Sequence, residues 1–345
     1  MFVLRDVATG DLEGLHAVAR HLDTVNLPDD RAVLGQLIEL SEQSFSGHLD
    51  PWKRQYLFGL FEREDGRSDG GERLVGTSMI HAQHGTRRAP HIYFDVLTDE
   101  RYSETLDRHI EHRVLRIGYN YNGPTEIGGL VLQPSLRGHS AGLGRWLSYV
   151  RFLYIALHRS KFRDVVLSEL LPPLESDGTS LLWESLGRNF TGMTYQEADH
   201  ISQNNKEFIR ALFPSEPIYA CLLPHAAQAL IGQVGPDTKG VEKMLRRIGF
   251  TYGGRIDPFD GGPHFTARTD EVTLVKATRR ARVIETATLP PQAGNGLVCV
   301  ERDRVPFFVA TGGRLAVEDD MVALLPETCA ALGVAAGDEV GVLPF

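Results

Sequence analysis

The chain has 345 residues, enough to bury a substantial core and to form two or three domains. Hydrophobic residues make up 42% of the chain and charged residues 23%, both ordinary for a soluble globular protein. The net charge of −9 argues against a nucleic-acid partner, because such partners usually need a basic face. A local basic pocket for one small anion is still compatible with this charge.

The cysteines and the N-terminus bear on the cellular compartment. Cys221, Cys299 and Cys329 are odd in number, lie far apart and form no CxxC motif, which predicts free, buried thiols in a reducing compartment. The N-terminus has no basic segment followed by a long apolar stretch, and no apolar run approaches the ~20 residues of a membrane span. We therefore expect a cytoplasmic protein without a membrane partner.

Hydrophobic periodicity predicts that the N-terminal part of the chain runs strand, helix, helix, strand, strand. Asp11 stands where it can cap the start of the first helix. The expected elements are a strand at 2–7, helices at 12–22 and 30–43, strands at 56–62 and 73–82, and a turn at 64–71.

A strand, helix and strand are expected further along the chain. Residues 126–132 predict a strand, Gly142–Ser160 a long amphipathic helix, and 165–170 a short apolar strand that suits the centre of a sheet. This order is that of a βαβ unit. Another strand is expected at Ile92–Leu97.

Two later segments are similar to each other, since each predicts a helix closed by a glycine and followed by phenylalanine and a strand. They span 181–195 and 241–256, and a partial duplication explains them as well as two ordinary capped helices do. Residues 286–296, which include adjacent prolines, predict a linker. This linker divides a main domain of residues 1–285 from a small β-rich C-terminal domain of residues 297–345.

The segment from Leu130 to Arg151 has the features of a phosphate cradle. Glycines allow a tight turn that brings several backbone N–H groups together, and the start of the following helix favours an anion. Neither the dinucleotide fingerprint GxGxxG nor a Walker A motif is matched, and a plain tight turn is the alternative. The residues expected to hold the anion or its carrier are Leu132, Arg137, Gly138, Gly142, Gly144 and Arg145.

This segment resembles the hallmark of the GNAT acyltransferase superfamily, a strand followed by Arg/Gln-x-x-Gly-x-Gly/Ala and a helix. Arg137 to Gly144 matches it with two extra residues. The resemblance implies an α/β fold with a mixed, GNAT-like sheet. It also implies an acyl-CoA co-substrate and no permanently bound cofactor.

Most of the chain resembles the arginine N-succinyltransferase family. The strings that carry the resemblance include Ser185-Leu186-Gly187, Ile231-Gly232-Gln233-Val234 and Phe259-Asp260-Gly261-Gly262-Pro263. The resemblance implies transfer of a succinyl group from succinyl-CoA to the α-amine of L-arginine, with Leu130 as a succinyl-CoA contact. It is compatible with a homo- or hetero-oligomer.

The chain departs from the family pattern at three places. Gly235 stands where the family has its proposed proton-donor histidine, and Leu170-Leu171-Pro172 replaces Met-Arg-Gly. A glycine-rich stretch near the N-terminus is reduced to residues 23–28. Two alternatives follow from these changes: a related acyltransferase with a different amine acceptor, or a non-catalytic partner subunit.

Four residues are candidates for handling the amine substrate. Glu169, which matches a family glutamate, can accept the amine proton or bind a cationic substrate, and His225 can replace the missing acid. Asp257 and Asp260 can bind a guanidinium group. The alternatives are an ion-paired glutamate, a surface histidine at a helix start and an ordinary Asp-Gly turn.

Histidine spacing gives a weaker signal. His81/His84 and His109/His112 have a spacing of three, which can bind metal on a helix. No matching cysteine or carboxylate set accompanies them in the sequence. We therefore expect surface residues and no metal site.

Overall fold

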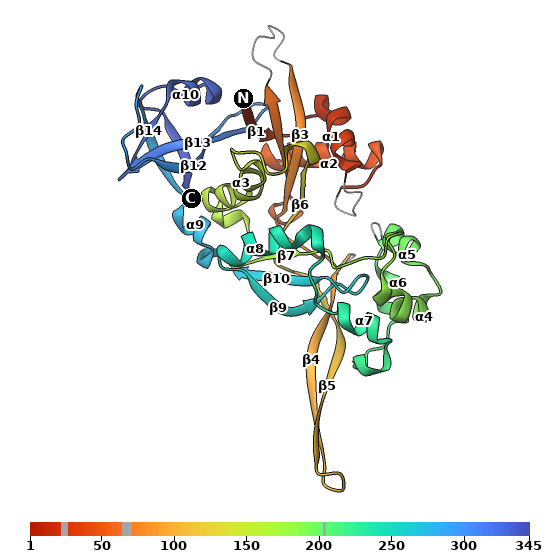
Figure 1. The fold of residues 1–345 in the computed structure, drawn as a ribbon. Coiled ribbons are helices and arrows are strands. Elements are labelled where there is room, and N and C mark those ends of the chain that lie inside the picture. The colour runs from red at the N-terminus through yellow and green to blue at the C-terminus, as the bar shows by residue number, and fades with distance from the viewer. Residues whose placement is uncertain (22–26, 64–70, 88, 203–204) are drawn as a thin grey trace. The chain divides into compact units, whose positions relative to one another are not determined.

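The computed structural model describes residues 1–21, 27–63, 71–87, 89–202 and 205–345. The chain forms two compact units (Figure 1). The first comprises Met1–Gln83, Thr125–Asp164 and Thr269–Phe345, and the second comprises His84–Pro124 and Val165–Arg268. The expected turn at 64–71 and the reduced stretch at 23–28 lie largely outside the described residues. Among the helices of the described residues, none is both long and apolar enough to cross a lipid bilayer.

The first unit is built on a sheet with the strand order β12-β15-β11-β14-β13-β1-β2-β3-β6. Neighbouring strands pair antiparallel, except for the parallel pair of β11 and β14. The strands are β1 (Phe2–Asp6), β2 (Gln55–Arg63), β3 (Glu72–His81), β6 (Thr125–Leu132), β11 (Arg279–Glu285), β12 (Gly294–Glu301), β13 (Phe308–Glu318), β14 (Met321–Leu324) and β15 (Glu339–Pro344).

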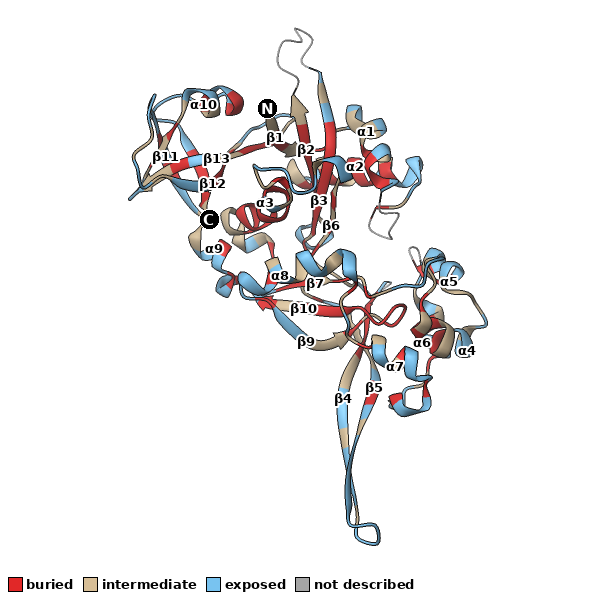
Figure 2. Ribbon diagram, viewed as in Figure 1, coloured by how far each residue is buried: buried red, intermediate tan, exposed pale blue. Residues whose placement is uncertain are grey.

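Helices cover both faces of the part of this sheet formed by β1, β2, β3 and β6. Successive side chains of a strand point to opposite faces. Leu57 of β2 joins the core beneath α1 (Leu12–Ala19) and α2 (Arg31–Phe45). Its neighbour Phe58 instead contacts Tyr154 of α3 (Leu143–Leu157), with ring centroids 5.6 Å apart. Figure 2 shows that much of α3 is buried. All residues from Trp146 to Ile155 are buried, Ser148 and Arg151 among them, so burial extends beyond the one apolar face that the sequence predicts.

The last five strands of the first unit close into a small barrel, because β12 pairs with β13 as well as with β15. Its interior is filled by apolar side chains such as Val283, Val298 and Val342, and α10 (Pro326–Leu332) adds Leu332. The short helix α9 (Thr273–Ala277) precedes β11. The expected β-rich C-terminal part is confirmed. The barrel also includes β11, which precedes the expected linker at 286–296, and the domain boundary there stays a prediction.

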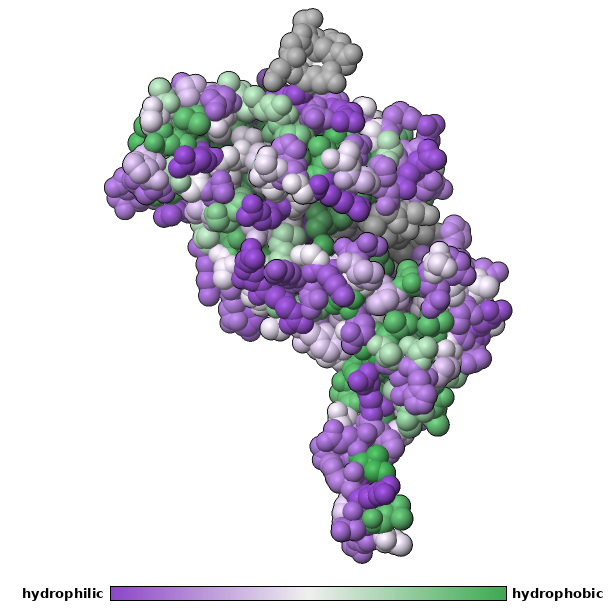
Figure 3. Space-filling view, viewed as in Figure 1, coloured by the Kyte–Doolittle hydropathy of each residue, from purple (hydrophilic) through white to green (hydrophobic). Residues whose placement is uncertain are grey.

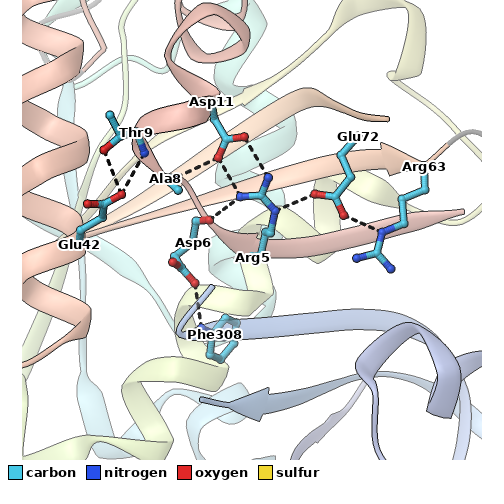
Figure 4. A network of polar contacts seen from close by, with 9 residues as sticks. All are labelled: Arg5, Asp6, Ala8, Thr9, Asp11, Glu42, Arg63, Glu72 and Phe308. Carbon is cyan, nitrogen blue, oxygen red and sulfur yellow. Dashed lines mark hydrogen bonds and ion pairs between the residues drawn. The ribbon is translucent and has the colours of Figure 1, made fainter. Parts of the chain in front are cut away.

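A network of polar contacts ties β1 to its neighbours (Figure 4). Arg5 donates to both carboxylate oxygens of Asp11 and to Glu72, at 2.8–2.9 Å. Asp6 accepts from the backbone N–H of Phe308 at 2.8 Å, which links β1 to the barrel. Asp11 precedes α1 as expected, but its carboxylate bonds Arg5 and the N–H of Ala8 and does not cap the helix.

The second unit has a sheet with the strand order β7-β10-β9-β4-β5-β8. Its strands are β4 (His91–Ser103), β5 (Arg108–Asn120), β7 (Val165–Glu169), β8 (Ile218–Tyr219), β9 (Thr251–Ile256) and β10 (Pro263–Arg268). Its helices are α4 (Arg188–Thr191), α5 (Tyr195–Ser202), α6 (Glu207–Leu212), α7 (His225–Leu230) and α8 (Lys239–Arg247). Trp183 and Phe259 stack within its core, with ring centroids 4.9 Å apart.

Strands β4 and β5 form a long two-stranded ribbon that is much longer than the expected strand at Ile92–Leu97 (Figure 1). Its far end carries exposed apolar side chains, among them Tyr102 and Leu106, within a hydrophilic surface (Figure 3). The ribbon lacks apolar–polar alternation beyond Leu97 because neither of its faces is buried there.

The two segments expected to share a helix–strand order differ. In the second, α8 is followed by Gly249, with φ of 108°, and by β9, as expected. In the first, Gly187 lies inside a π-helical turn that continues into α4, and Gly192, with φ of 72°, ends that helix. The expected strand at Gly192–Tyr195 is wrong, because residues from Tyr195 begin α5. The duplication stays a prediction.

All three cysteines carry free thiols. Cys299 and Cys329 are buried as expected, and burial raises the pKa of each thiol. Cys221 is exposed, so the expectation of a buried thiol is wrong there.

Candidate functional site

The predicted strand, turn and helix are present in the first unit as β6, a turn and α3. Gly138 and Gly142 have φ of 77° and 73°, the left-handed conformation that favours glycine. The Gly142 amide donates to the His139 carbonyl at 2.8 Å, and α3 begins at the next residue. The turn therefore leads directly to the N–H groups of Leu143 and Gly144, which precede the first hydrogen bonds of α3 and can bind an anion.

Two arginines flank this turn. Arg137 is exposed and its Nε reaches the Leu132 carbonyl at 3.4 Å. Arg145 is also exposed, and its guanidinium lies beside Gly142, where a Cβ would meet Nη2 at 2.8 Å. A Cβ on Gly144 would meet nothing within 4 Å, so the first turn of α3 is open at that point. Exposed guanidinium groups beside free helix N–H groups suit a phosphate.

The pairing of β6 with β3 is interrupted at the predicted succinyl-CoA contact. Thr77 pairs with Val131 and Met79 with Gly128, so that Gly129 and Leu130 fall within the interruption. Leu130 and Leu132 are half-buried, while Val131 between them lies in the core beneath α1 and α2. An interrupted strand offers backbone groups that an extended ligand can pair with.

A buried guanidinium joins α3 to this interruption. Arg151 donates to the Ser148 carbonyl at 3.0 Å and to the Ser148 Oγ at 2.9 Å, and its Nη1 reaches the Gly128 carbonyl at 3.4 Å. Burial lowers the pKa of Arg151 to about 9. The side chain therefore positions β6 relative to the helix that follows the cradle.

Glu169 is the centre of a cluster in the second unit. It ends β7 and pairs in register with His264 of β10, whose Nε2 lies 3.3 Å from Glu169 Oε1. His91, the first residue of β4, places its Nε2 3.2 Å from the same oxygen. The Glu169 side chain is 27% exposed, whereas those of His91 and His264 are 3% and 1% exposed. His84 contacts the His91 ring, with centroids 4.5 Å apart.

The charges of this cluster are set by burial and by its own members. Burial, together with nearby His84, lowers the pKa of His91 to about 4, so this imidazole is neutral at pH 7. Burial alone would raise the pKa of Glu169, but His264, His91 and His84 together hold it well below its ordinary value. A carboxylate with a lowered pKa holds a proton weakly, so the arrangement favours binding of a positive charge over acceptance of the amine proton.

Asp257 and Asp260 lie in the turn between β9 and β10. Asp257 accepts from the N–H groups of Phe259 and Asp260 at 2.7 and 3.3 Å, and Asp260 accepts from Gly262 at 2.7 Å. The side chains of Asp257, Glu169 and His264 offer atoms that all lie within 4.8 Å of one another. Burial and the charge of Glu169 raise the pKa of Asp257 to about 7, and burial and Asp257 raise that of Asp260. Within the described residues, neither aspartate forms an ion pair with arginine or lysine.

Neither of the two positions considered for the acid adds a side chain to these groups. His225 is exposed at the first turn of α7 and is not among the side chains gathered around Glu169. Gly235 donates its N–H to the Leu171 carbonyl at 2.9 Å, and a Cβ there would lie 2.6 Å from the Pro172 carbonyl oxygen. No side chain fits at Gly235 unless this backbone moves.

The sequence pointed to Glu169 but not to the imidazoles around it. His84, expected at the surface with His81, is half-buried beside His91. His91 and His264 come from strands far apart in the chain, so no local spacing connects them. The two other histidines of that expectation lie on β5, where His109 is exposed and His112 is half-buried.

Comparison with known proteins shows which family the chain is similar to. A family model described as "Arginine N-succinyltransferase beta subunit" matches residues 2–274. The arginine N-succinyltransferase of Yersinia pestis is 33% identical over 99% of this chain and 97% of the relative. The arginine N-succinyltransferase subunit beta of Pseudomonas aeruginosa is 34% identical over 79% of this chain and 78% of the relative.

A solved structure extends the likeness to three dimensions. It is described as arginine/ornithine succinyltransferase subunit AI from Pseudomonas aeruginosa. The match covers 100% of this chain and 98% of the chain in that structure. The two structures agree with a TM-score of 0.83 at 30% sequence identity. The mixed α/β fold expected from the sequence is thereby confirmed.

The fold and these likenesses define the chain as an acyltransferase. It belongs to the arginine N-succinyltransferase family, as the resemblance in its sequence predicted.

Proposed function

We propose that the protein transfers the succinyl group of succinyl-CoA to the α-amine of L-arginine. The observation that carries this proposal is the match to an arginine N-succinyltransferase over 99% of the chain. The fold agreement with a solved succinyltransferase, over 100% of this chain and 98% of that one, supports it. The activity named for these relatives is theirs. In this chain, the glycine-rich turn and the two aspartates give physical reasons for extending that activity to it.

The reaction is a direct attack on a thioester. The neutral α-amine nitrogen attacks the succinyl carbonyl carbon, an N–C bond forms, the C–S bond breaks, and CoA leaves as a thiolate. The amine loses one proton during the reaction, and this proton passes through water to the solvent or to the departing thiolate. Because a thiol has a pKa near ~8.5, its thiolate leaves without obligatory help from an acid. This chemistry is compatible with Gly235, which carries no proton donor.

We assign succinyl-CoA to the glycine-rich turn of the first unit. Gly138, Gly142 and Gly144 keep the turn and the helix start open to the phosphates, and the first N–H groups of α3 can donate to them. Arg137 and Arg145 add charge-assisted hydrogen bonds. The interruption of β6 at Leu130, with the half-buried Leu132 nearby, offers an edge for the amide groups of the CoA arm.

We assign the guanidinium of arginine to Asp257 and Asp260. Both carboxylates are largely buried and lie beside the negative charge of Glu169, which makes the turn a favourable place for a cation. A guanidinium presents several N–H donors in a planar fork that matches carboxylates. The N–H groups of the turn already hold one oxygen of each aspartate, so the carboxylates are oriented before a ligand arrives.

The test is an assay of CoA release by the purified chain alone. Succinyl-CoA is offered with L-arginine, L-ornithine and L-lysine, and acetyl-CoA replaces succinyl-CoA in a parallel series. We expect the highest kcat/KM for succinyl-CoA with arginine. Ornithine is included because the solved relative is described as an arginine/ornithine succinyltransferase. Absence of release above spontaneous hydrolysis with arginine, or a preference of more than tenfold for another acceptor, would reject the proposal.

A further inference from the structure

The histidines around Glu169 contact neither substrate in the proposed acyl transfer, and no step of that reaction is assigned to them. His84 precedes β4, His91 begins it, and Glu169 ends β7, so three separate positions of the second unit converge. Each offers one ligand atom, and these three atoms all lie within 4.8 Å of one another. His91 is 3% exposed, and among the described residues neither of its ring nitrogens makes a hydrogen bond.

The lack of a hydrogen bond at His91 is informative because a carboxylate is so near. Its Nε2 lies 3.2 Å from Glu169 Oε1, close enough for a hydrogen bond, yet the ring is not directed at this oxygen in the way that a hydrogen bond requires. Buried polar atoms are nearly always satisfied, so a third group between the two is expected. Ligand atoms about 2.0–2.1 Å from a tetrahedral zinc ion lie roughly 3.3 Å from one another. The 3.2 Å between His91 Nε2 and Glu169 Oε1 matches this spacing, and the His84 atom lies within 4.8 Å of both.

We propose that His84, His91 and Glu169 bind a divalent transition-metal ion, with zinc as the favoured ion. Two imidazoles and one carboxylate are a ligand set that zinc accepts, and three protein ligands leave a fourth position for water or for another small donor. His264 lies beside the same carboxylate, with its Nε2 3.3 Å from Oε1, and adds a further buried imidazole next to the three ligands. This inference does not depend on the proposed succinyl transfer, because metal binding is measured without turnover.

The experiment uses the full chain without a histidine tag, since a tag would bind zinc itself. The protein is stripped with a chelator, dialysed against zinc and then against metal-free buffer, and its metal content is measured by plasma mass spectrometry. We expect one zinc per wild-type chain, with an X-ray absorption spectrum typical of imidazole and oxygen ligands. Zinc is also expected to raise the melting temperature of the wild type.

Two ligand variants and one matched control make the result specific. His84→Ala and Glu169→Gln change side chains that are partly exposed, so they are expected to fold, and circular dichroism checks this. Both should bind zinc at least tenfold more weakly and lose its effect on the melting temperature. His109→Ala removes an exposed histidine of β5 outside the cluster and should bind zinc like the wild type.

Two outcomes would overturn the proposal. One is a wild-type chain that retains no stoichiometric zinc, and also no nickel, cobalt or copper offered in the same way. The other is zinc binding that is equal in the wild type, His84→Ala and Glu169→Gln, which would place the ion elsewhere.

Discussion

Gly235 and Leu171 are joined by a backbone hydrogen bond of 2.9 Å, from the Gly235 N–H to the Leu171 carbonyl. Thr238 Oγ1 donates to the same carbonyl at 2.8 Å. Two departures from the family pattern therefore contact each other. One is glycine in place of histidine at 235, and the other is Leu-Leu-Pro in place of Met-Arg-Gly at 170–172. The backbone of Leu171 and Pro172 fills the space that a side chain at position 235 would need.

Gly235→His is expected to destabilise the protein and not to increase its activity. A Cβ at this position would lie 2.6–2.9 Å from three backbone atoms of Leu171 and Pro172, which can yield only if the chain moves. Such overpacking costs about 1–3 kcal/mol of unfolding free energy. Denaturant unfolding and the rate of succinyl transfer measure the two effects.

Gly240→Ala is the matched control, because a Cβ on this glycine of α8 would meet nothing within 4 Å. Its unfolding free energy should be unchanged or slightly higher. A Gly235→His variant as stable as the wild type and more active would contradict this interpretation of the contact.

Arg137→Ala and Arg145→Ala should each raise the KM for succinyl-CoA. Loss of a charge-assisted hydrogen bond to a phosphate costs about 1.5–3 kcal/mol, which corresponds to a rise of roughly ten- to a hundredfold. The KM for arginine should not change, and the effect should shrink at high salt. Arg73→Ala, which removes an exposed arginine of β3, is the control and should match the wild type. Unchanged KM values in both Arg137 and Arg145 variants would place the phosphates elsewhere.

Asp257→Asn and Asp260→Asn should raise the KM for arginine at least tenfold and leave that for succinyl-CoA unchanged. The amide oxygen of asparagine can still accept the N–H groups of the turn, so the fold should persist, but the amide cannot become the negatively charged partner of a bound guanidinium. Steady-state kinetics with each substrate varied in turn separates the two KM values. Asp237→Asn, at an exposed position outside the turn, is the control. If the substitutions lower only kcat, these residues do not bind the guanidinium.

Glu301 should make the stability of the first unit depend on pH. Burial alone would raise the pKa of Glu301, but His158 and Arg280 outweigh this and hold it below its ordinary value. The stabilising contribution is therefore present above the unfolded-state pKa of about 4.3 and is lost as the pH falls through the lower folded-state pKa. Glu301→Gln should lose about 0.5–1 kcal/mol at pH 7, a modest amount because the pair is partly exposed to solvent. Unfolding curves from pH 7 to pH 3 should show this difference vanish on acidification, whereas a difference that stays constant would contradict it.

Much of the first unit could be predicted from the sequence, because its elements have local signals. The apolar face of α3 predicts the helix, and the glycines at 138 and 142 predict the turn before it. The adjacent prolines at 290 and 291 suggested a linker there, but β11 on its N-terminal side belongs to the barrel. Which strand joins a barrel depends on pairings between distant segments, and periodicity does not contain them.

The cluster around Glu169 could be predicted only in part for the same reason. The family resemblance points to Glu169, but His91 and His264 lie more than seventy residues from it in the chain. His264 reaches it through the pairing of β10 with β7, and His91 lies at the start of β4. The error at Gly187 has a different origin. A glycine after an apolar helix looks like a cap, yet Gly187 packs against the Trp183 ring inside the helix, and Gly192 supplies the left-handed end.

The central claim is most directly tested by identifying the product made from arginine labelled with nitrogen-15 at its α-amine. The chain is incubated with this arginine and succinyl-CoA, and the product is examined by mass spectrometry and by nitrogen NMR. The account predicts arginine plus one succinyl group, with the labelled nitrogen converted from an amine to an amide. An unmodified arginine, or a succinyl group on an unlabelled nitrogen, would contradict it.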